Sequence, residues 1–458
     1  MKKAVVILAA GLGTRLKSKK PKVLHTLLGK PMIAHVLDSV AKLRPDKIVV
    51  VVHPHHEDVH KVVKHYHARL AIQNRMSGTA DAVKTALEHL KKFRGVILVL
   101  NGDSPLLSPV TLRQLLSKHQ RTRSEISVLS FTAAEPYSYG RIIRDSSGKA
   151  LRIVEENDLS DAEKNIREVN SGVYAFNDNV GKLVGRIQLN RKKKEYYITD
   201  LLEIARLTNH ACSVFDIGNE AECHGVNTMF DLIKAETIMQ KHIIERFMNA
   251  GVRFYDPGSV VVHPDTKIGP DCVIYPNVCF EGKTVIGEGA LIFQGVRVID
   301  SKIGRRVVIL DHSLLEISEI GDDSVVGPCA HLRPHTKLGK SVKIGNFVEI
   351  KNASLSDRTK ASHLSYIGDA TIGADVNIGA GTITCNYDGF RKHHTRIRNG
   401  VFVGSDTQLV APVEIGKNAF IAAGSTITSN VTPFALAMSR TRQREIAGWV
   451  KKQKRKRK

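Results

Sequence analysis

A glycine-rich segment near the amino terminus carries the groups needed to bind phosphate. The apolar residues 4–10 lead into Gly11-Leu12-Gly13-Thr14-Arg15-Leu16, and Lys22 follows shortly afterwards. Glycines let backbone N–H groups approach phosphate oxygens, and Arg15 and Lys22 add cationic donors. The segment is neither a Walker A loop nor a G-x-G-x-x-G motif, because residue 16 is leucine and no Gly-Lys-Ser/Thr follows. A tight strand-to-helix turn would explain the glycines but not the cations, so we favour phosphate binding.

Two further residues stand where chemistry could take place. Asp103 follows the apolar residues 96–100, and a carboxylate just past a buried strand is a natural Mg²⁺ ligand, with a helix cap or turn aspartate as the alternative. His363 interrupts a repeating pattern, where it could act as a general base or be a solvated corner histidine. The zinc-protease pattern His56-Glu57-x-x-His60 is rejected, since the sequence offers no obvious third ligand.

Alternating strand and helix patterns must position the first of these residues. Short apolar runs without polar alternation predict a mostly parallel sheet covered on both faces, with ligands beyond the carboxyl ends of the strands. The predicted strands are residues 4–10, 48–52, 96–100, 126–131, 172–176 and 213–217, with helices at 32–43 and 80–91 and a hairpin formed by 141–144 and 151–155.

From about residue 250 a different period takes over. An aliphatic residue followed by glycine recurs from Ile268-Gly269 to Ile415-Gly416, at steps close to multiples of six. This repeat predicts a hexapeptide parallel β-helix in which the aliphatic side chain fills the interior and three hexapeptides make one turn. We place one domain at 1–226, a connecting helix at 227–250, the β-helix at 251–436 and a terminal segment at 437–458, with residues 391–398 as a projecting loop and 191–194 as a basic loop.

Composition excludes several classes of protein. The 458 residues are 42% apolar and 25% charged, as in an ordinary globular chain, and no apolar run approaches the roughly 20 residues of a membrane span. Six cysteines without a C-x-x-C pair indicate free thiols in a reducing cytoplasm, and residues 1–10 have no spacer leading to a signal cleavage site.

The net charge of +23 includes a tail, residues 451–458, with seven basic and no acidic side chains. We expect this tail to be disordered. It could bind nucleic acid or anionic lipid, but a solubilising role without a dedicated partner is the interpretation we prefer.

Four segments together resemble one bacterial enzyme family. Residues 8–16 with Pro21-Lys22-Val23-Leu24, and residues 345–351, 377–389 and 402–408, resemble the bifunctional N-acetylglucosamine-1-phosphate uridyltransferase/glucosamine-1-phosphate N-acetyltransferases, nearly to Trp449. The resemblance implies a Rossmann-like nucleotidyltransferase domain followed by a left-handed β-helix. It also implies acetyl transfer from acetyl-CoA to glucosamine-1-phosphate, then uridylyl transfer from UTP with release of pyrophosphate, in the service of peptidoglycan and lipopolysaccharide synthesis.

The same resemblance implies roles for individual residues. Arg15 and Lys22 would neutralise the UTP phosphates, Asp103 and Asn227 would hold Mg²⁺, and His363 would take the proton from the attacking amine. The UTP and UDP-sugar pocket would comprise Leu8, Ala9, Gly11, Gly13, Lys22, Gln73, Gly78, Thr79, Gly140, Glu155, Asn170 and Asn227. The second sugar phosphate would bind Arg333, Lys351, Tyr366 and Asn377, and acetyl-CoA would bind Ala380, Asn386, Tyr387, Ser405, Ala423 and Arg440, with Lys392 nearby. Homotrimers would build this second site between subunits.

Some positions depart from the family pattern, and two alternatives stay open. Ser77, Ala80, Asn101 and His335 replace the residues usual in relatives, which bears on substrate preference. One alternative is a nucleotidyltransferase whose β-helix only oligomerises, which His363 and Lys351 oppose. The other is a non-catalytic translation-factor subunit with the same two folds, which Arg15, Lys22 and Asp103 oppose.

Overall fold

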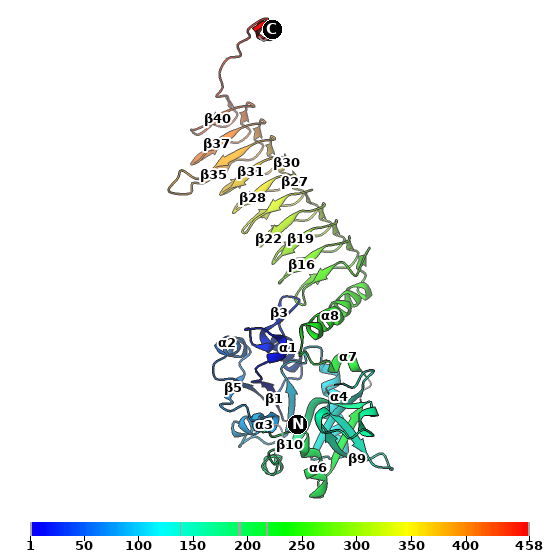
Figure 1. Cartoon of the computed structure of the whole chain (residues 1–458). Coiled ribbons are helices and arrows are strands. Elements are labelled where there is room, and N and C mark those ends of the chain that lie inside the picture. Colours follow the sequence, from blue (N-terminus) through cyan, green and yellow to red (C-terminus); the bar gives the residue numbers. More distant parts are fainter. Residues whose placement is uncertain (1, 138, 191–193, 217–218, 457–458) are drawn as a thin grey trace. The chain divides into compact units, whose positions relative to one another are not determined.

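The computed structural model describes residues 2–137, 139–190, 194–216 and 219–456 (Figure 1). It contains two compact units, Met1–Met239 and Gln240–Lys458. Residues 191–193 of the predicted basic loop, and Ile217 at the end of a predicted strand, lie outside the described residues. In the part of the chain that is described, no helix is both long and apolar enough to cross a membrane. All six cysteines are free thiols.

The first unit is built on a nine-stranded sheet. Its main path runs β11 (Cys212–Asp216), β7 (Ile126–Thr132), β10 (Glu168–Asn177), β6 (Val96–Asn101), β1 (Lys3–Ala9), β4 (Lys47–Val52) and β5 (Arg69–Ile72), and the hairpin β8 (Arg141–Arg144) and β9 (Ala150–Val154) joins it beside β10. Neighbours on the main path are parallel except around β10, which is antiparallel to both β6 and β7. The predicted mostly parallel sheet and its hairpin are therefore confirmed, whereas the four-residue β5 was not predicted.

Helices cover both faces of this sheet. Successive residues of a strand point to opposite faces, and in β1 the residues on both faces are apolar and need to be buried. Val5 and Ile7 belong to one apolar cluster, and Ala4 and Val6 belong to the other. The helices are α1 (Met32–Ala41), α2 (Glu57–His65), α3 (Thr79–Glu88), α4 (Pro109–Thr122), α5 (Gly181–Val184), α6 (Asp200–Leu207) and α7 (Glu220–Cys223). A short hairpin of β2 (Thr26–Leu27) and β3 (Lys30–Pro31) precedes α1. The predicted connecting helix is α8 (Met229–Asn249).

The second unit is a left-handed parallel β-helix with three sheets. Eleven short strands run from β12 (Arg253–Phe254) to β41 (Leu436–Ala437), ten from β13 (Val261–Val262) to β40 (Thr426–Ile427), and nine from β14 (Lys267–Ile268) to β38 (Val413–Ile415). Nearly every strand pairs with the third strand after it, so that each turn stacks on the next (Figure 1). The hexapeptide prediction is therefore confirmed.

Close stacking of the coils explains the residue that follows each inward aliphatic side chain. Ile286 and Ile303 point inward and are almost completely buried. A Cβ atom on Gly287, which follows Ile286, would lie only 2.6 Å from the carbonyl group of Gly304 in the next coil. Glycine is thus required there because neighbouring backbones approach too closely for a side chain.

Two predictions about irregular segments need correction. The projecting loop does not extend to residue 398, because β35 (Thr395–Ile397) returns to the third sheet. The basic tail, predicted to be disordered, forms helix α9 (Trp449–Lys456). Lysine, arginine and glutamine are good helix formers, and the helix contains neither glycine nor proline, so local propensity prevails over charge repulsion. Residues 457 and 458 lie outside the described residues.

Candidate functional site

Two adjoining cavities lie beyond the carboxyl ends of β1 and β6. The larger, about 510 Å³, is lined by residues that include Leu8, Ala9, Gly11, Gly13, Arg15, Lys22, Gln73, Gly78, Thr79, Asp103 and Asn227. The smaller, about 310 Å³, is lined by Gly140, Glu155 and Asn170 among others. The wall common to both consists of Leu8, Arg15, Thr79, Asn101, Asp103 and Asn227. The structure thus brings together every residue predicted for the first site.

Backbone hydrogen bonds bring the distant parts of this wall together. The N–H of Gly102 donates to the carbonyl of Leu8 at 2.8 Å, which places the end of β6 beside the glycine-rich segment. The N–H of Val226 donates to the carbonyl of Asp103 at 2.9 Å, and this bond sets the next residue, Asn227, beside Asp103.

Cations and oxygen ligands meet at the centre of the wall. The ammonium group of Lys22 forms an ion pair with the carboxylate of Asp103 and lies 2.7 Å from Oδ1 of Asn227. Arg15 donates to the same amide oxygen at 2.8 Å. Asp231, which the sequence did not indicate, accepts from the N–H groups of Asn227 and Thr228 and fixes that turn.

A buried amide forms another part of the larger cavity. Gln73 is 4% exposed, and its amide nitrogen donates to Asp81 at 2.8 Å and to the carbonyl of Gly78 at 3.3 Å. Gly78 has a φ of +105°, and a Cβ atom on it would clash with the backbone of Tyr196. Glycine is therefore required at this bend, and Asp81 orients a side chain that the family resemblance places in the UTP pocket.

A carboxyl group with a raised pKa lines the smaller cavity, and a second one is next in the chain to a lining residue. Burial raises the pKa of Glu155, although the hydroxyl of Thr199 donates to its carboxylate at 3.0 Å. Burial, together with Glu203 and Asp158, also raises the pKa of Asp200 to about 6. Asn170 donates from its amide nitrogen to the hydroxyl of Tyr174 at 2.8 Å. The pocket therefore offers an amide and a weakly acidic carboxyl, which can hydrogen-bond sugar hydroxyl groups.

In the β-helix, His363 ends strand β30 (Lys360–His363) on an exposed surface. Its Nδ1 atom lies 3.0 Å from Oδ1 of Asn346, at the end of the neighbouring β27 (Lys343–Asn346). An amide oxygen can only accept a hydrogen bond, so this contact favours a proton on Nδ1 and leaves Nε2 able to accept one.

Three cations, two at the adjoining sheet and one in the loop before β35, lie close together. Lys351 lies at the end of β28 (Glu349–Lys351), and the positive charges of Lys392 and Arg333 lower its pKa. Arg333 also donates to Glu349 at 2.8 Å. Tyr366 begins β31 (Tyr366–Gly368), which pairs with β28, whereas Asn377 begins β33 (Asn377–Ile378) in the first sheet. Because these cations repel one another, an anion that binds between them would stabilise this surface.

The residues predicted for acetyl-CoA lie along successive coils. The N–H of Asp406, next to Ser405, donates to the carbonyl of Ala380, and the N–H of Gly424, next to Ala423, donates to the carbonyl of Ser405. Arg440 reaches the same row, since its guanidinium donates to the carbonyl of Ala423 at 2.8 Å.

The segment between β34 (Ile383–Cys385) and β35 carries the two remaining residues predicted for acetyl-CoA. The amide of Asn386 is buried and donates to Asp369, while Tyr387 is exposed and its hydroxyl donates to the carbonyl of Gly389 at 2.6 Å.

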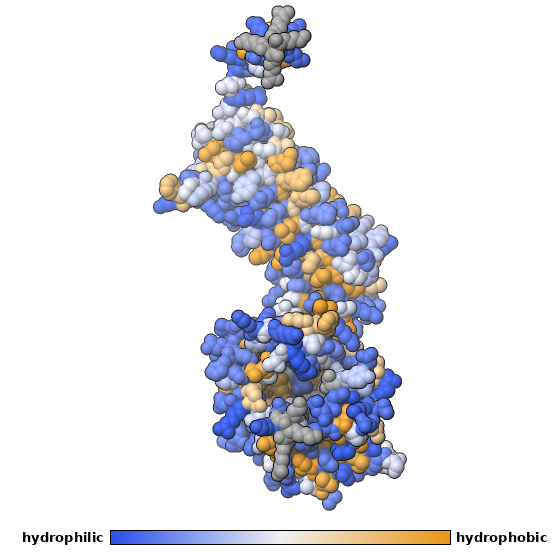
Figure 2. All heavy atoms as spheres, in the orientation of Figure 1, coloured by the Kyte–Doolittle hydropathy of each residue, from blue (hydrophilic) through white to orange (hydrophobic). Residues whose placement is uncertain are grey.

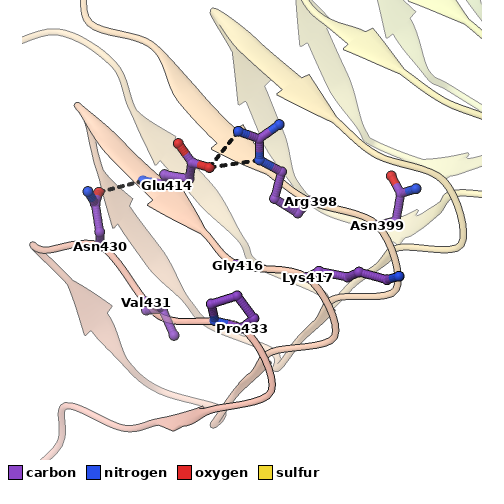
Figure 3. Close-up of a pocket in the computed structure, with 8 residues that line it drawn as sticks. All are labelled: Arg398, Asn399, Glu414, Gly416, Lys417, Asn430, Val431 and Pro433. Carbon is purple, nitrogen blue, oxygen red and sulfur yellow. Dashed lines mark hydrogen bonds and ion pairs between the residues drawn. The ribbon is translucent and has the colours of Figure 1, made fainter.

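A separate hollow of about 510 Å³ occurs in the last coils (Figure 3). Glu414 accepts there from the guanidinium of Arg398 at 2.7 Å, and its backbone N–H donates to Asn430. The residues predicted for acetyl transfer do not line this hollow, so its size alone gives it no place in the candidate site.

Fold and site define a nucleotidyltransferase joined to a hexapeptide-repeat acyltransferase. Residues 4–219 match the nucleotidyl transferase family model, residues 257–344 the GMPPB C-terminal domain model, and residues 394–429 the bacterial transferase hexapeptide (six repeats) model.

Similar proteins match the chain over almost its whole length. The bifunctional protein GlmU of Thermodesulfovibrio yellowstonii is 47% identical over 98% of this chain and 99% of its own. The proteins of the same name from Alkaliphilus metalliredigens and Staphylococcus haemolyticus are 43% and 44% identical, and each match covers at least 98% of both chains. The chain belongs to the bifunctional GlmU family.

Membership of this family settles the reactions. The protein is a bifunctional enzyme of UDP-N-acetylglucosamine synthesis that acetylates glucosamine-1-phosphate from acetyl-CoA and transfers uridylyl from UTP to N-acetylglucosamine-1-phosphate. Both alternatives considered from the sequence, a purely oligomerising β-helix and a non-catalytic subunit, give way to this assignment.

Proposed function

We propose that the larger cavity binds UTP and the smaller one binds N-acetylglucosamine-1-phosphate. The observation that carries this assignment is the common wall, which contains Arg15, Asp103 and Asn227, with Lys22 bound to the last two from the larger cavity. Reacting phosphates held on the two sides of this wall would lie against the same cations. The sugar phosphate then attacks the α-phosphorus in line, and Arg15 and Lys22 neutralise charge as pyrophosphate leaves.

The oxygen atoms of Asp103 and Asn227 fit a hard divalent cation. Both converge on one ammonium group, that of Lys22, and so already surround a positive charge. In the described residues no group of three or more His, Cys, Asp or Glu is arranged to hold a metal. Two oxygen ligands nevertheless suit Mg²⁺, which completes its coordination with water and substrate phosphates. Mg²⁺ bound there would neutralise the phosphate oxygens.

We also propose that His363 is the general base of acetyl transfer. Nε2 accepts a proton from the substrate amine as the amine nitrogen attacks the thioester carbonyl. The C–S bond then breaks, and coenzyme A leaves and takes up a proton as its thiol. The hydrogen bond that Nδ1 donates to Asn346 holds the ring. Arg333, Lys351 and Lys392 bind the phosphate of the sugar, and the row of Ala380, Ser405 and Ala423 binds acetyl-CoA.

The acetyltransferase site is exposed on one β-helix. In a homotrimer formed through the β-helix, a neighbouring subunit would cover it. Phe402 and Phe420 are 41% and 46% exposed and stack with their ring centroids 4.6 Å apart, while Phe390, in the segment before β35, is 93% exposed. Hydrophobic residues also lie among hydrophilic ones on the visible face of the coils (Figure 2). Burial of such side chains drives association, and the threefold symmetry of the trimer would repeat the site three times.

These assignments imply a role for each domain and a cellular compartment for the enzyme. Residues 1–226 would act as the uridyltransferase and residues 251–436 as the acetyltransferase, joined by residues 227–250. UTP and acetyl-CoA are cytoplasmic metabolites, which supports work in the cytoplasm.

Single-site variants test the assignment of the two reactions to two places. Asp103→Ala should remove Mg²⁺-dependent pyrophosphate release and leave acetyl transfer intact, whereas His363→Ala should have the reverse effect. Pyrophosphate release and free coenzyme A would be measured on the same preparations. Loss of both reactions in either variant would contradict two independent sites, and retention of pyrophosphate release in the Asp103 variant would refute its assignment.

A further inference from the structure

Arg141 is the largest fully buried side chain of the described residues, and it carries a charge. It begins β8 and is 1% exposed. Burial of a guanidinium is costly unless the charge is paired, so the contacts of this side chain must offset that cost.

The guanidinium of Arg141 joins two segments of the smaller cavity. Its Nη2 atom lies 2.7 Å from Oε2 of Glu156, and its Nη1 atom donates to the carbonyl of Tyr139. Glu156 follows Glu155, and Tyr139 precedes Gly140. The same side chain therefore fixes the neighbours of two residues that line the cavity.

The backbone of Arg141 holds the third segment as well. In the sheet, Arg141 is paired with Val154 of β9 and with Val169 of β10. Glu155 comes directly after Val154, and Asn170 directly after Val169. The N–H of Asn170 also donates to the carbonyl of Gly140 at 2.8 Å.

We propose that Arg141 is a positioning residue for the sugar-phosphate half of the uridyltransferase site. Gly140 and Glu155 directly flank β8 and β9, Asn170 lies in β10, and each is next in the chain to a residue that Arg141 pairs with, or to Arg141 itself. The proposal rests on the proposed function of the smaller cavity. A misplacement of catalytic or binding groups by about 1 Å can reduce rates by up to 10²-fold, so an arginine that never touches substrate can govern the affinity for the sugar.

A second ion pair on the same strand provides a matched control. Arg144, three residues along β8, binds both oxygens of Glu168 at 2.6 and 2.7 Å. This pair is also partly buried, but it does not contact the neighbours of Gly140 or Glu155. A general effect of losing an arginine from the hairpin would appear in Arg144→Met as well.

The experiment compares KM values for the two substrates of uridylyl transfer. Arg141→Met should raise KM for N-acetylglucosamine-1-phosphate about tenfold, equivalent to about 1.4 kcal/mol, with KM for UTP changed less than twofold. Arg141→Lys should have a smaller effect, since an ammonium can reach Glu156 but cannot also hold the Tyr139 carbonyl with a fork. Glu156→Gln removes the negative charge of the partner at a position that is 36% exposed, and should raise the same KM about threefold.

Acetyl transfer, catalysed by the other unit, quantifies the protein in each preparation, and an unchanged KM for UTP reports that the uridyltransferase unit is folded. Equal changes in both KM values, or an equal effect of Arg144→Met, would overturn the positioning role. Glu155→Gln separates this failure from failure of the proposed function. If that variant leaves the KM for the sugar phosphate unchanged, the cavity assignment is wrong; if it raises the KM while Arg141→Met does not, only the role of Arg141 is wrong.

Discussion

Replacement of Lys22 by methionine should have two effects of opposite sign. The side chain is 13% exposed, and its ammonium group lies against the carboxylate of Asp103 and the amide oxygen of Asn227. Methionine keeps an unbranched apolar stem without the charge. Uridylyl transfer should fall about 10²- to 10³-fold, as expected when one charged group is removed from developing phosphate charge. Divalent-cation binding to the ligand-free enzyme should become tighter, because the ammonium no longer competes for the two oxygen ligands.

The ion pair between Lys22 and Asp103 sets the expected gain in divalent-cation affinity. Opposite charges about 3 Å apart interact by roughly 5 kcal/mol at an effective dielectric constant of about 20. Hydration of the released ammonium offsets most of this attraction. A remainder of about 1–2 kcal/mol corresponds to roughly 5- to 30-fold tighter cation binding.

Mn²⁺, titrated without UTP and followed by its electron paramagnetic resonance signal, gives the affinity directly. Lys22→Arg keeps the charge and should not show the tighter binding. Lys22→Met combined with Asp103→Ala should lose it, because one ligand is gone. Unchanged or weaker Mn²⁺ binding in Lys22→Met would refute the view that Lys22 occupies the metal ligands.

Three further predictions concern other parts of the chain. Asp200→Asn should stabilise the protein at pH 7, because the pKa of the Asp200 carboxyl is raised from 3.8 to about 6 and its ionisation between those pH values destabilises the fold. Since the side chain is only partly buried, solvent screening limits the expected difference to about 1 kcal/mol. Chemical denaturation at pH 4 and pH 7 should show the difference only at the higher pH. Gly172→Ala should cost roughly 1–3 kcal/mol because φ is +77° there and a Cβ atom would press on the amide of Asn101, and kinetics should show a raised KM for the sugar phosphate. Truncation after Val450 should leave both activities within twofold, and a larger fall in either rate would show that the basic helix takes part.

Periodicity in the sequence predicted the two folds because each leaves a regular mark. Buried strands such as β1 and β6 are continuous apolar runs, and each coil of the β-helix repeats its inward aliphatic residue. Strand β5 has only four residues, two of them with polar or exposed character, so no pattern distinguishes it. Helix α9 was missed because repulsion between its charges was given more weight than helix propensity.

The site residues that could be predicted are those that follow a recognisable strand in the sequence. Arg15, Lys22 and Asp103 follow strand ends, where ligands gather in such sheets. Asn227 and Gln73 have no local signal and were inferred only from the family pattern. Arg141 in the sequence resembles an ordinary surface cation of a hairpin, because its burial depends on how β8, β9 and β10 pair in the folded sheet. Its contacts could be found only in the folded structure.

The central claim, that one chain catalyses two successive transfers at separate sites, is tested most directly by following products by mass spectrometry. One tube holds the protein with glucosamine-1-phosphate, acetyl-CoA, UTP and Mg²⁺, and a second holds N-acetylglucosamine-1-phosphate, UTP and Mg²⁺. The account predicts UDP-N-acetylglucosamine in both tubes. Product in the second tube alone would reduce the β-helix to a structural element, and product in neither would contradict the assignment of both sites.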